Sequence, residues 1–253
     1  MTQKLELEGI NLDIAIATEK PAVSTINPEF LIGAGISDEI QLVSEPILTK
    51  DFASVELAQN IRISGEFGRV AFSELMTGKT NDSLKIPGMA TRYTKILSHL
   101  GYKAFALNYR GFRSFIDDQD GARKYIIENF FPNASWQTIG KSPARASVNL
   151  VFEMSRSPLY MNITEATVRK EDESTMPIVM FSGSFSYVLD GENAAEKLAY
   201  MHECIGNWQS DFAEFTDIMN NHFLVQPVVE SYQQLPQVET EEVPNIFAMT
   251  AAV

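Results

Sequence analysis

The sequence predicts an α+β protein built mostly on antiparallel sheet. Three well-patterned strands follow one another between residues 146 and 189, and their connectors, 155–158 and 170–174, are short enough for hairpins. Helical patterns lie before and after such runs of strands. A doubly wound parallel sheet is the alternative fold, but it needs a helical crossover between strands, and residues 146–189 leave no room for one.

The first half of the chain begins with a strand. Apolar side chains occupy every second position there: Ile10, Leu12, Ile14 and Ile16. Asn27 and Pro28 then predict the cap and first turn of a short helix that Gly33 and Gly35 close. Residues 39–72 are rich in Val, Ile, Leu and Phe and predict two to four antiparallel strands. A helix follows, from Pro87-Gly88 to Gly101.

The second half repeats this order. Residues 105–109 alternate as a strand, Asp117 or Asp118 can cap a helix that Pro132 stops, and the three strands of 146–189 come next. An internal duplication of a β-α-β-β-β-α unit would explain the repeat, although such orders also arise by chance and few residues are identical between the halves. We therefore expect two similar halves, 1–101 and 102–225, followed by a tail, 226–253.

The last helix is predicted to be long. A heptad seam with spacings of three and four, apolar up to its last position, consists of Leu198, Met201, Ile205, Trp208, Phe212, Phe215, Met219 and His222. A continuous helix over 192–223 would be about 48 Å long, which exceeds what one small meander covers. Either the whole seam packs on the protein's own sheet, or its C-terminal part, with Phe212 and Phe215, also meets a partner.

Composition excludes several classes of partner. The 253 residues are 45% hydrophobic, which is enough for a substantial core, and the formal net charge is −13. Such a charge repels phosphate backbones and anionic lipid surfaces, so we expect neither nucleic acid nor membrane as a partner. The N-terminus lacks the order of a signal peptide and no long uncharged apolar run exists, which predicts a cytoplasmic protein.

The sequence is poor in groups that bind metals or act as nucleophiles. Cys204 is the only cysteine, so no intrachain disulfide and no cysteine-rich zinc site can form. The three histidines, His99, His202 and His222, have no ligand spacing. No complete phosphate loop, dinucleotide fingerprint or nucleophile elbow is present. We expect no metal and no cofactor.

One segment has the character of a small-anion site. Arg110-Gly111-Phe112-Arg113 directly follows a strand, and two guanidinium groups three residues apart could hold a carboxylate or phosphate. In an enzyme, Asp117 or Asp118 would be the general base beside such a substrate. The alternative is that these arginines pair with local acids, including Asp117 and Asp118.

The tail has a different composition from the rest of the chain. Prolines recur among acidic and polar residues from 226 onward, and such a segment cannot bury enough apolar area to order itself. It nevertheless carries an apolar cluster, Ile246, Phe247 and Met249, behind an acidic spacer, as a docking peptide would. The cluster either docks on another chain or folds back on its own.

Together these features favour a non-enzymatic binding or assembly protein that acts through apolar surface and a C-terminal docking tail. We expect a protein partner or self-association as an oligomer. The alternative is an enzyme that acts on a small anionic substrate held by Arg110 and Arg113.

Overall fold

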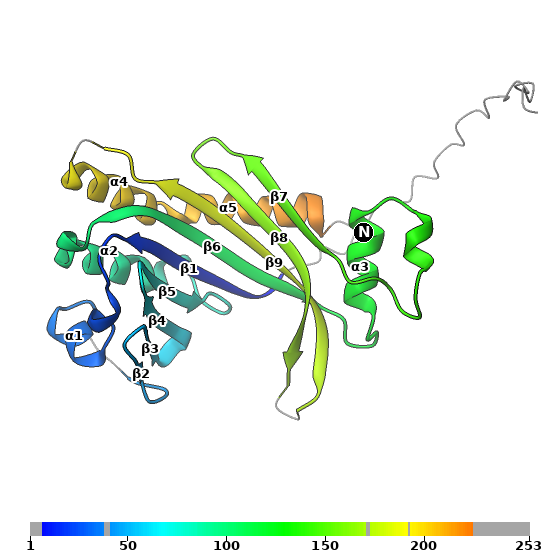
Figure 1. Ribbon diagram of the computed structural model, residues 1–253, viewed down its shortest axis with the longest axis horizontal. Coiled ribbons are helices and arrows are strands. Elements are labelled where there is room, and N and C mark those ends of the chain that lie inside the picture. Colours follow the sequence, from blue (N-terminus) through cyan, green and yellow to red (C-terminus); the bar gives the residue numbers. More distant parts are fainter. Residues whose placement is uncertain (1–6, 38–40, 171–172, 192, 225–253) are drawn as a thin grey trace, which may run out of the picture.

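The chain folds around one twisted antiparallel sheet that carries its helices on one face (Figure 1). The computed structural model describes residues 7–37, 41–170, 173–191 and 193–224. Within these residues the strand order is β2-β3-β4-β5-β1-β6-β9-β8-β7, and each neighbouring pair is antiparallel. The predicted α+β class with antiparallel sheet is confirmed.

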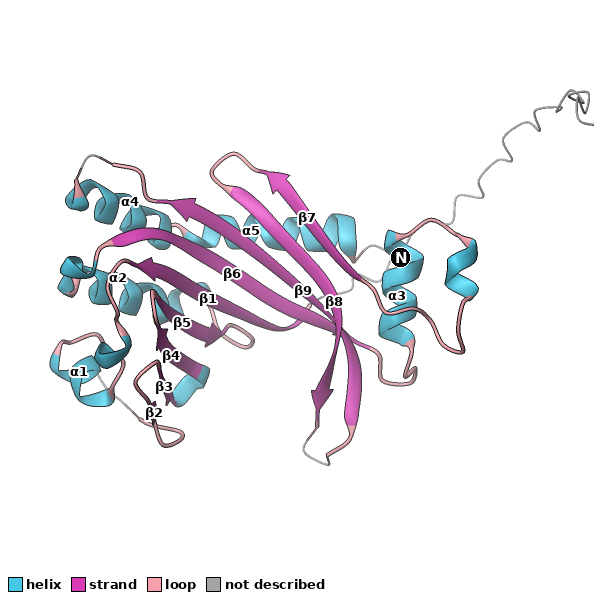
Figure 2. Ribbon diagram, in the orientation of Figure 1, coloured by secondary structure: helices cyan, strands magenta, loops and turns pink. Residues whose placement is uncertain are grey.

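The first half contributes five strands and two α-helices (Figure 2). In chain order they are β1 (Glu8–Thr18), α1 (Pro28–Gly33), β2 (Ile47–Leu48), β3 (Phe52–Leu57), β4 (Ile61–Glu66), β5 (Arg69–Leu75) and α2 (Ile86–Ile96). The strands after α1 are the antiparallel set predicted from residues 39–72.

The second half contributes the remaining described strands and α-helices. They are β6 (Tyr102–Ser114), α3 (Gly121–Phe130), β7 (Ser147–Glu153), β8 (Pro158–Arg169), β9 (Thr175–Val188), α4 (Ala194–Gly206) and α5 (Trp208–Ile218). Strands β7, β8 and β9 form the predicted meander, and β9 pairs with β6. The sheet is therefore continuous across residue 101, through the pairing of β1 with β6.

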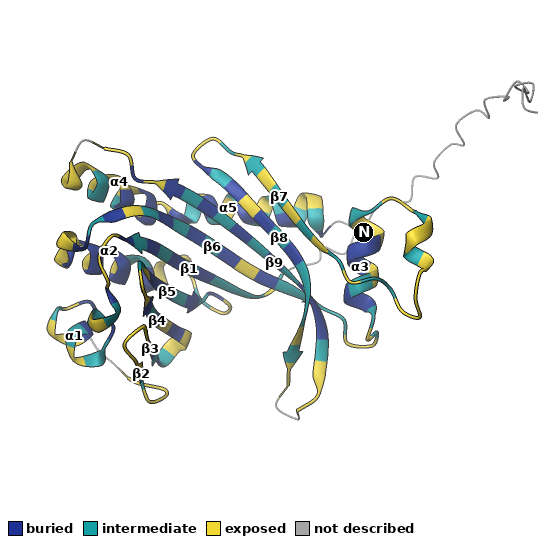
Figure 3. Cartoon of the chain, viewed as in Figure 1, coloured by how far each residue is buried: buried dark blue, intermediate teal, exposed yellow. Residues whose placement is uncertain are grey.

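Alternation along the strands separates a buried face from an open one (Figure 3). On β1 the side chains of Leu12, Ile14 and Ile16 are fully buried under the helices, while the residues between them face the other side. The same two-residue period on every long strand produces one apolar core between the sheet and the helical layer.

The starts of two helices have clear chemical causes. The Asn27 side chain accepts a hydrogen bond from the Phe30 N–H at 2.8 Å, which confirms the predicted cap of α1. At α2 the cap comes from outside the helix. The fully buried carboxylate of Glu74 accepts hydrogen bonds from the N–H groups of Lys85 at 2.8 Å and Ile86 at 3.0 Å, and it pairs with Lys79.

The predicted continuous helix over 192–223 is wrong. The segment instead forms α4, α5 and a π-helical turn, Met219–Phe223. The break lies at Asn207, whose φ and ψ are −99° and 19°. Gly206 and Asn207 are both poor helix formers, which explains the position of the break. Most of the seam nevertheless packs on the protein's own sheet: Met201, Ile205, Trp208, Phe215 and Met219 are buried, whereas His222 is exposed.

The helix before the meander also begins differently from the prediction. The cap position of α3 is Asp120, with no side-chain cap, whereas Asp117 and Asp118 precede it. Asp118 accepts instead from the Asp120 N–H at 3.0 Å and so shapes the turn before the helix. Among the helices that the structure describes, none combines the length and apolarity that a membrane crossing requires.

Candidate functional site on the open face of the sheet

The open face, defined as the sheet face opposite the helices, is lined by polar side chains across its centre. None of the described helices packs on it (Figure 1). Register places one row of side chains on five neighbouring strands, from β7 to β1: Asn149, Asn162, Ser182, Arg110 and Asn11. A second row lies beside it: Ser184, Asn108, Asp13 and Ser73.

Side chains of these rows are linked across strands. The Asn162 amide donates to the Asn149 side-chain oxygen at 2.8 Å, and the Asn11 amide donates to the Ser73 hydroxyl at 2.9 Å. The Asn108 amide donates to the Asp13 carboxylate at 2.9 Å. Such links reduce the freedom of the side chains and so lower the entropic cost of ordering them around a ligand.

Charges on the open face are almost all paired. The Arg62 Nε lies 3.0 Å from Glu56 Oε1, and Arg69 lies 3.5 Å from the Glu66 carboxylate and 3.8 Å from that of Asp13. Arg110, in contrast, makes no ion pair or hydrogen bond with any residue that the structure describes. Its guanidinium is an exposed cation with neutral amides and hydroxyls on one side, and on the other the carboxylates of Asp13 and Glu66, both of which pair with Arg69.

The pKa of Asp13 is affected by the charge of Arg110 nearby. Burial raises the pKa of this carboxyl above its ordinary value, while the hydrogen bond from Asn108 and the charges of Arg69 and Arg110 oppose that rise. Arg110 therefore influences Asp13 through its field without a direct contact. The positive charge of Arg110 remains available to another anion.

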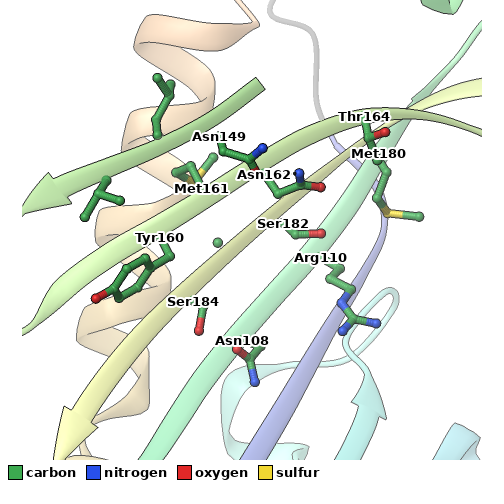
Figure 4. Close-up of a pocket in the computed structure, with 13 residues that line it drawn as sticks. Asn108, Arg110, Asn149, Tyr160, Met161, Asn162, Thr164, Met180, Ser182 and Ser184 are labelled. Carbon is green, nitrogen blue, oxygen red and sulfur yellow. Dashed lines mark hydrogen bonds between the residues drawn. The ribbon is translucent and has the colours of Figure 1, made fainter. Parts of the chain in front are cut away.

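Two hollows meet at Arg110. The larger has a volume of about 510 Å³. It is lined by the parts of the two rows that lie on β6, β9, β8 and β7, from Arg110 to Asn149, and by Tyr160 (Figure 4). The smaller, of about 240 Å³, extends from Arg110 toward Asp13 and Arg69. In Figure 4 the labelled polar side chains of neighbouring strands lie on the same side of the sheet. The open face can thus offer a cation and many hydrogen-bonding groups to one ligand.

The structure separates the two arginines of the predicted anion site. Strand β6 continues to Ser114, so residues three apart lie on opposite faces. The Arg113 guanidinium lies on the helical side, 4.8 Å from the ring centroid of Tyr125 and 5.2 Å from that of Phe115. Arg110 and Arg113 therefore cannot clamp a single anion.

The predicted general bases lie apart from Arg110 as well. Asp118 forms an ion pair with Lys124 at 2.7 Å, and this hydrogen bond holds the pKa of the Asp118 carboxyl below its ordinary value. Neither Asp117 nor Asp118 lines the two hollows. The structure also differs from the alternative prediction, in which Asp117 and Asp118 pair with the two arginines. Asp118 pairs with Lys124, and Arg113 lies over aromatic rings.

The residues predicted to meet a partner have different positions. Phe215 is fully buried against Gly183 and the ring of Tyr109, and Phe212 is half-buried beside Tyr109 and Trp208. The burial of Phe215 favours the core role that we also considered. Residues Ile246, Phe247 and Met249 lie outside the described residues.

Sequence reasoning missed a buried polar cluster under the other face. Asp211 is fully buried, accepts a hydrogen bond from the Tyr187 hydroxyl at 2.6 Å and pairs with Arg156. Burial raises the pKa of the Asp211 carboxyl, against the effects of Tyr187 and Arg156. The cluster fastens the β7–β8 turn to α5, which is a structural role. Its only early signal was an acidic residue, Asp211, among the apolar positions of the last helix.

Neither the cysteine nor the histidine of the 202–204 segment forms a reactive site. Cys204 is buried and burial raises the pKa of its thiol, which lowers the thiolate fraction. His202 contacts the Thr94 hydroxyl of α2 at 2.9 Å. Within the described part of the chain, no three His, Cys, Asp or Glu side chains are grouped as metal ligands would be.

Comparison with known proteins adds no relative to this picture. No family model matches the chain, and no curated protein matches it. The function proposed for the protein therefore depends on the geometry of the open face.

Proposed function

We propose that the protein is a non-enzymatic binding protein whose open face holds a partner by an acidic group. The observation that carries this proposal is the unpaired Arg110 among two rows of polar side chains in which the one acid, Asp13, already accepts a hydrogen bond from Asn108. A guanidinium and a carboxylate or phosphate form short, charge-assisted hydrogen bonds, each with a net worth of about 1.5–3 kcal/mol. The amides and hydroxyls would bind the polar groups on either side of that anion.

Charge restricts the class of partner. The chain has a net charge of −13, and the other two arginines of the open face are already paired with carboxylates. Among the described arginines of the open face, a polyanion such as nucleic acid would meet one free guanidinium, within a repulsive field. A partner with one exposed acidic group on a mostly neutral polar surface fits better, and an acidic segment of another protein has that character.

The test compares Arg110→Ala with Arg62→Ala. Arg62 lies on the same face but is paired with Glu56, so its replacement is a matched control. Wild type and both variants are immobilised, exposed to extract of the native cell and compared by quantitative mass spectrometry. We expect partners that wild type and Arg62→Ala retain and that Arg110→Ala loses, with affinity reduced about 10- to 150-fold. Equal retention by all three proteins would contradict the proposal.

The enzymatic alternative has lost its geometric support. Its arginines lie on opposite faces of β6, and Asp118 is paired with Lys124. Among the described acids that line the two hollows, Asp13 already accepts from Asn108 and Glu66 already pairs with Arg69. Binding remains the better proposal for the open face.

Two further sequence-based proposals concern the whole chain. A docking role for the tail, 226–253, stays a proposal because these residues lie beyond those described. Duplication of the two halves is supported by the sheet order, because β1 and β6 lie together at its centre and each is followed outward by the last strand of its own half, β5 or β9. Superposition of residues 8–100 on residues 102–224 tests the duplication. A close fit in which the helices of one half lie on those of the other would support it.

A further inference from the structure

The two edges of the sheet are built differently. Strand β2 at one edge has only two residues and follows Pro46, which leaves little backbone to pair. Strand β7 at the other edge has seven residues and pairs with β8 without interruption, from Ser147 opposite Thr164 to Glu153 opposite Pro158. Short strands and prolines are common protections of a sheet edge, and β7 has neither.

The side chains of β7 are suited to further pairing. Val148, Leu150 and Phe152 face the helical side, where they pack at the margin of the core and stay half-exposed. Val151 faces the open side and is 57% exposed. Glu153 is the only charged residue of the strand, and β7 pairs with no described strand other than β8. An edge of this kind is a template for another strand.

We propose that β7 pairs antiparallel with β7 of a second copy of this chain, about a twofold axis that passes through Leu150. In that register Leu150 lies opposite Leu150 of the copy, and Val148 lies opposite Phe152. Asn149 lies opposite Val151 on the open face. Residues directly opposite each other share a face, so the half-exposed apolar side chains of both copies cover one another. The pairing is isologous and therefore closes at two copies.

Self-complementarity supports a second copy as the occupant. Val148, Leu150 and Phe152 of one copy meet the same three residues of the other, so each half-exposed apolar side chain on the helical side of β7 has an apolar partner. In the proposed register Glu153 lies opposite the uncharged Ser147, so no like charges of the two strands face each other. Arg145 forms an ion pair with Glu165 of its own chain and takes no part in the pairing.

The experiment places charges at the Asn149 and Val151 positions. These side chains are exposed and point away from the core, so their replacement leaves the interior unchanged. The variant N149K/V151K places Lys opposite Lys twice, and N149E/V151E places Glu opposite Glu twice. Sedimentation velocity should give a dimer for wild type, of twice the 28.3 kDa chain mass, and a monomer for each variant. An equimolar mixture of the two variants should dimerise again and dissociate when salt is raised.

Two results would overturn the proposal. A wild-type protein that stays monomeric at high concentration would do so, and so would a dimer that persists in N149K/V151K. Recovery in the mixture also verifies that both variants are folded. An independent measurement uses the wild type alone, because amides of residues 147–153 should exchange hydrogen more slowly as protein concentration rises. Exchange that is independent of concentration would count equally against pairing at β7.

Discussion

Three buried tyrosines hold α5, and the turn that follows it, in place. The Tyr109 hydroxyl of β6 donates to the Trp208 carbonyl at 2.7 Å, and that of Tyr187 donates to Asp211 on the same helix. The hydroxyl of Tyr125 donates to the Phe223 carbonyl just beyond it. Each bond satisfies a polar group in the core at a single helix position. Apolar packing alone would allow the helix to slide, so these residues define its register.

The first prediction concerns His202 and pH. Burial, and the nearby charge of Lys95 to a lesser extent, lower the pKa of the His202 imidazole below 6.5. Below about pH 6.5 the unfolded chain therefore takes up this proton more readily than the folded chain, so folding stability falls as pH falls. His202→Gln removes this dependence and can keep the contact with Thr94. As pH falls, the free energy of unfolding of wild type should decrease by less than about 1 kcal/mol more than that of the variant. The difference is small because the ring is only half-buried and water screens its charge.

Urea unfolding at pH 7.5 and 5.0 measures that difference. His99→Gln is the matched control, since His99 is exposed. The control should follow wild type at both values of pH. If His202→Gln also follows it, burial of this imidazole does not contribute to the pH dependence of stability.

At the scale of elements, the contact of α5 with the sheet depends on a missing side chain. A Cβ built at Gly183 of β9 would lie 2.7 Å from ring atoms of Phe215 and 3.2 Å from the Met161 sulfur. Glycine at this position lets the Phe215 ring lie directly on the backbone of the strand. The local sequence, Ser182-Gly183-Ser184, does not by itself indicate this packing role.

The second prediction compares two glycines. Gly183→Ala should destabilise the fold by about 1–3 kcal/mol, because the added methyl group forces Phe215 out of its position. Gly206→Ala, at the end of α4, meets no atom within 4 Å and should stabilise by about 0.5–1 kcal/mol through helix propensity. Thermal unfolding of both variants beside wild type is the measurement. Equal effects of the two changes would mean that the Gly183 contact is not tight.

Local periodicity predicted the strands well, because alternation of buried and open side chains depends only on neighbours in sequence. It failed to locate the points where a helix or a strand ends. The seam through Phe215 keeps spacings of three and four across Asn207, so spacing alone could not locate the break. Arg110 and Arg113 were expected to converge because β6 was expected to end earlier. The strand runs to Ser114 and alternation then separates them.

The candidate site was only partly within reach of the sequence. The sequence predicted Arg110 as an anion-binding residue, and it remains the residue on which the proposal rests. Its neighbours were not identified, because Asn11 and Ser182 are far from it in sequence and come beside it only through the strand order β1-β6-β9. Strand order depends on long-range pairing, which a periodic pattern does not encode.

At the scale of the whole molecule, the tail is the remaining prediction. Deletion of residues 237–253 should abolish association through the apolar cluster of Ile246, Phe247 and Met249 while the melting temperature stays unchanged. Calorimetry and the retention assay described for Arg110 test both parts. A truncated protein that melts several degrees lower and keeps its partners would place the tail within the fold instead.

The central position of β1 affects how the protein is made. β1 leaves the ribosome before the other described strands, and it pairs on one side with β5 and on the other with β6. Chain elongation proceeds at about 5–20 residues per second, so the β6 side of β1 stays unpaired for several seconds at least after β1 emerges. During that time the nascent chain exposes a full strand edge in the middle of its future sheet. We therefore expect chaperones that shield unpaired strands to act on this protein chiefly before residue 114 has been synthesised.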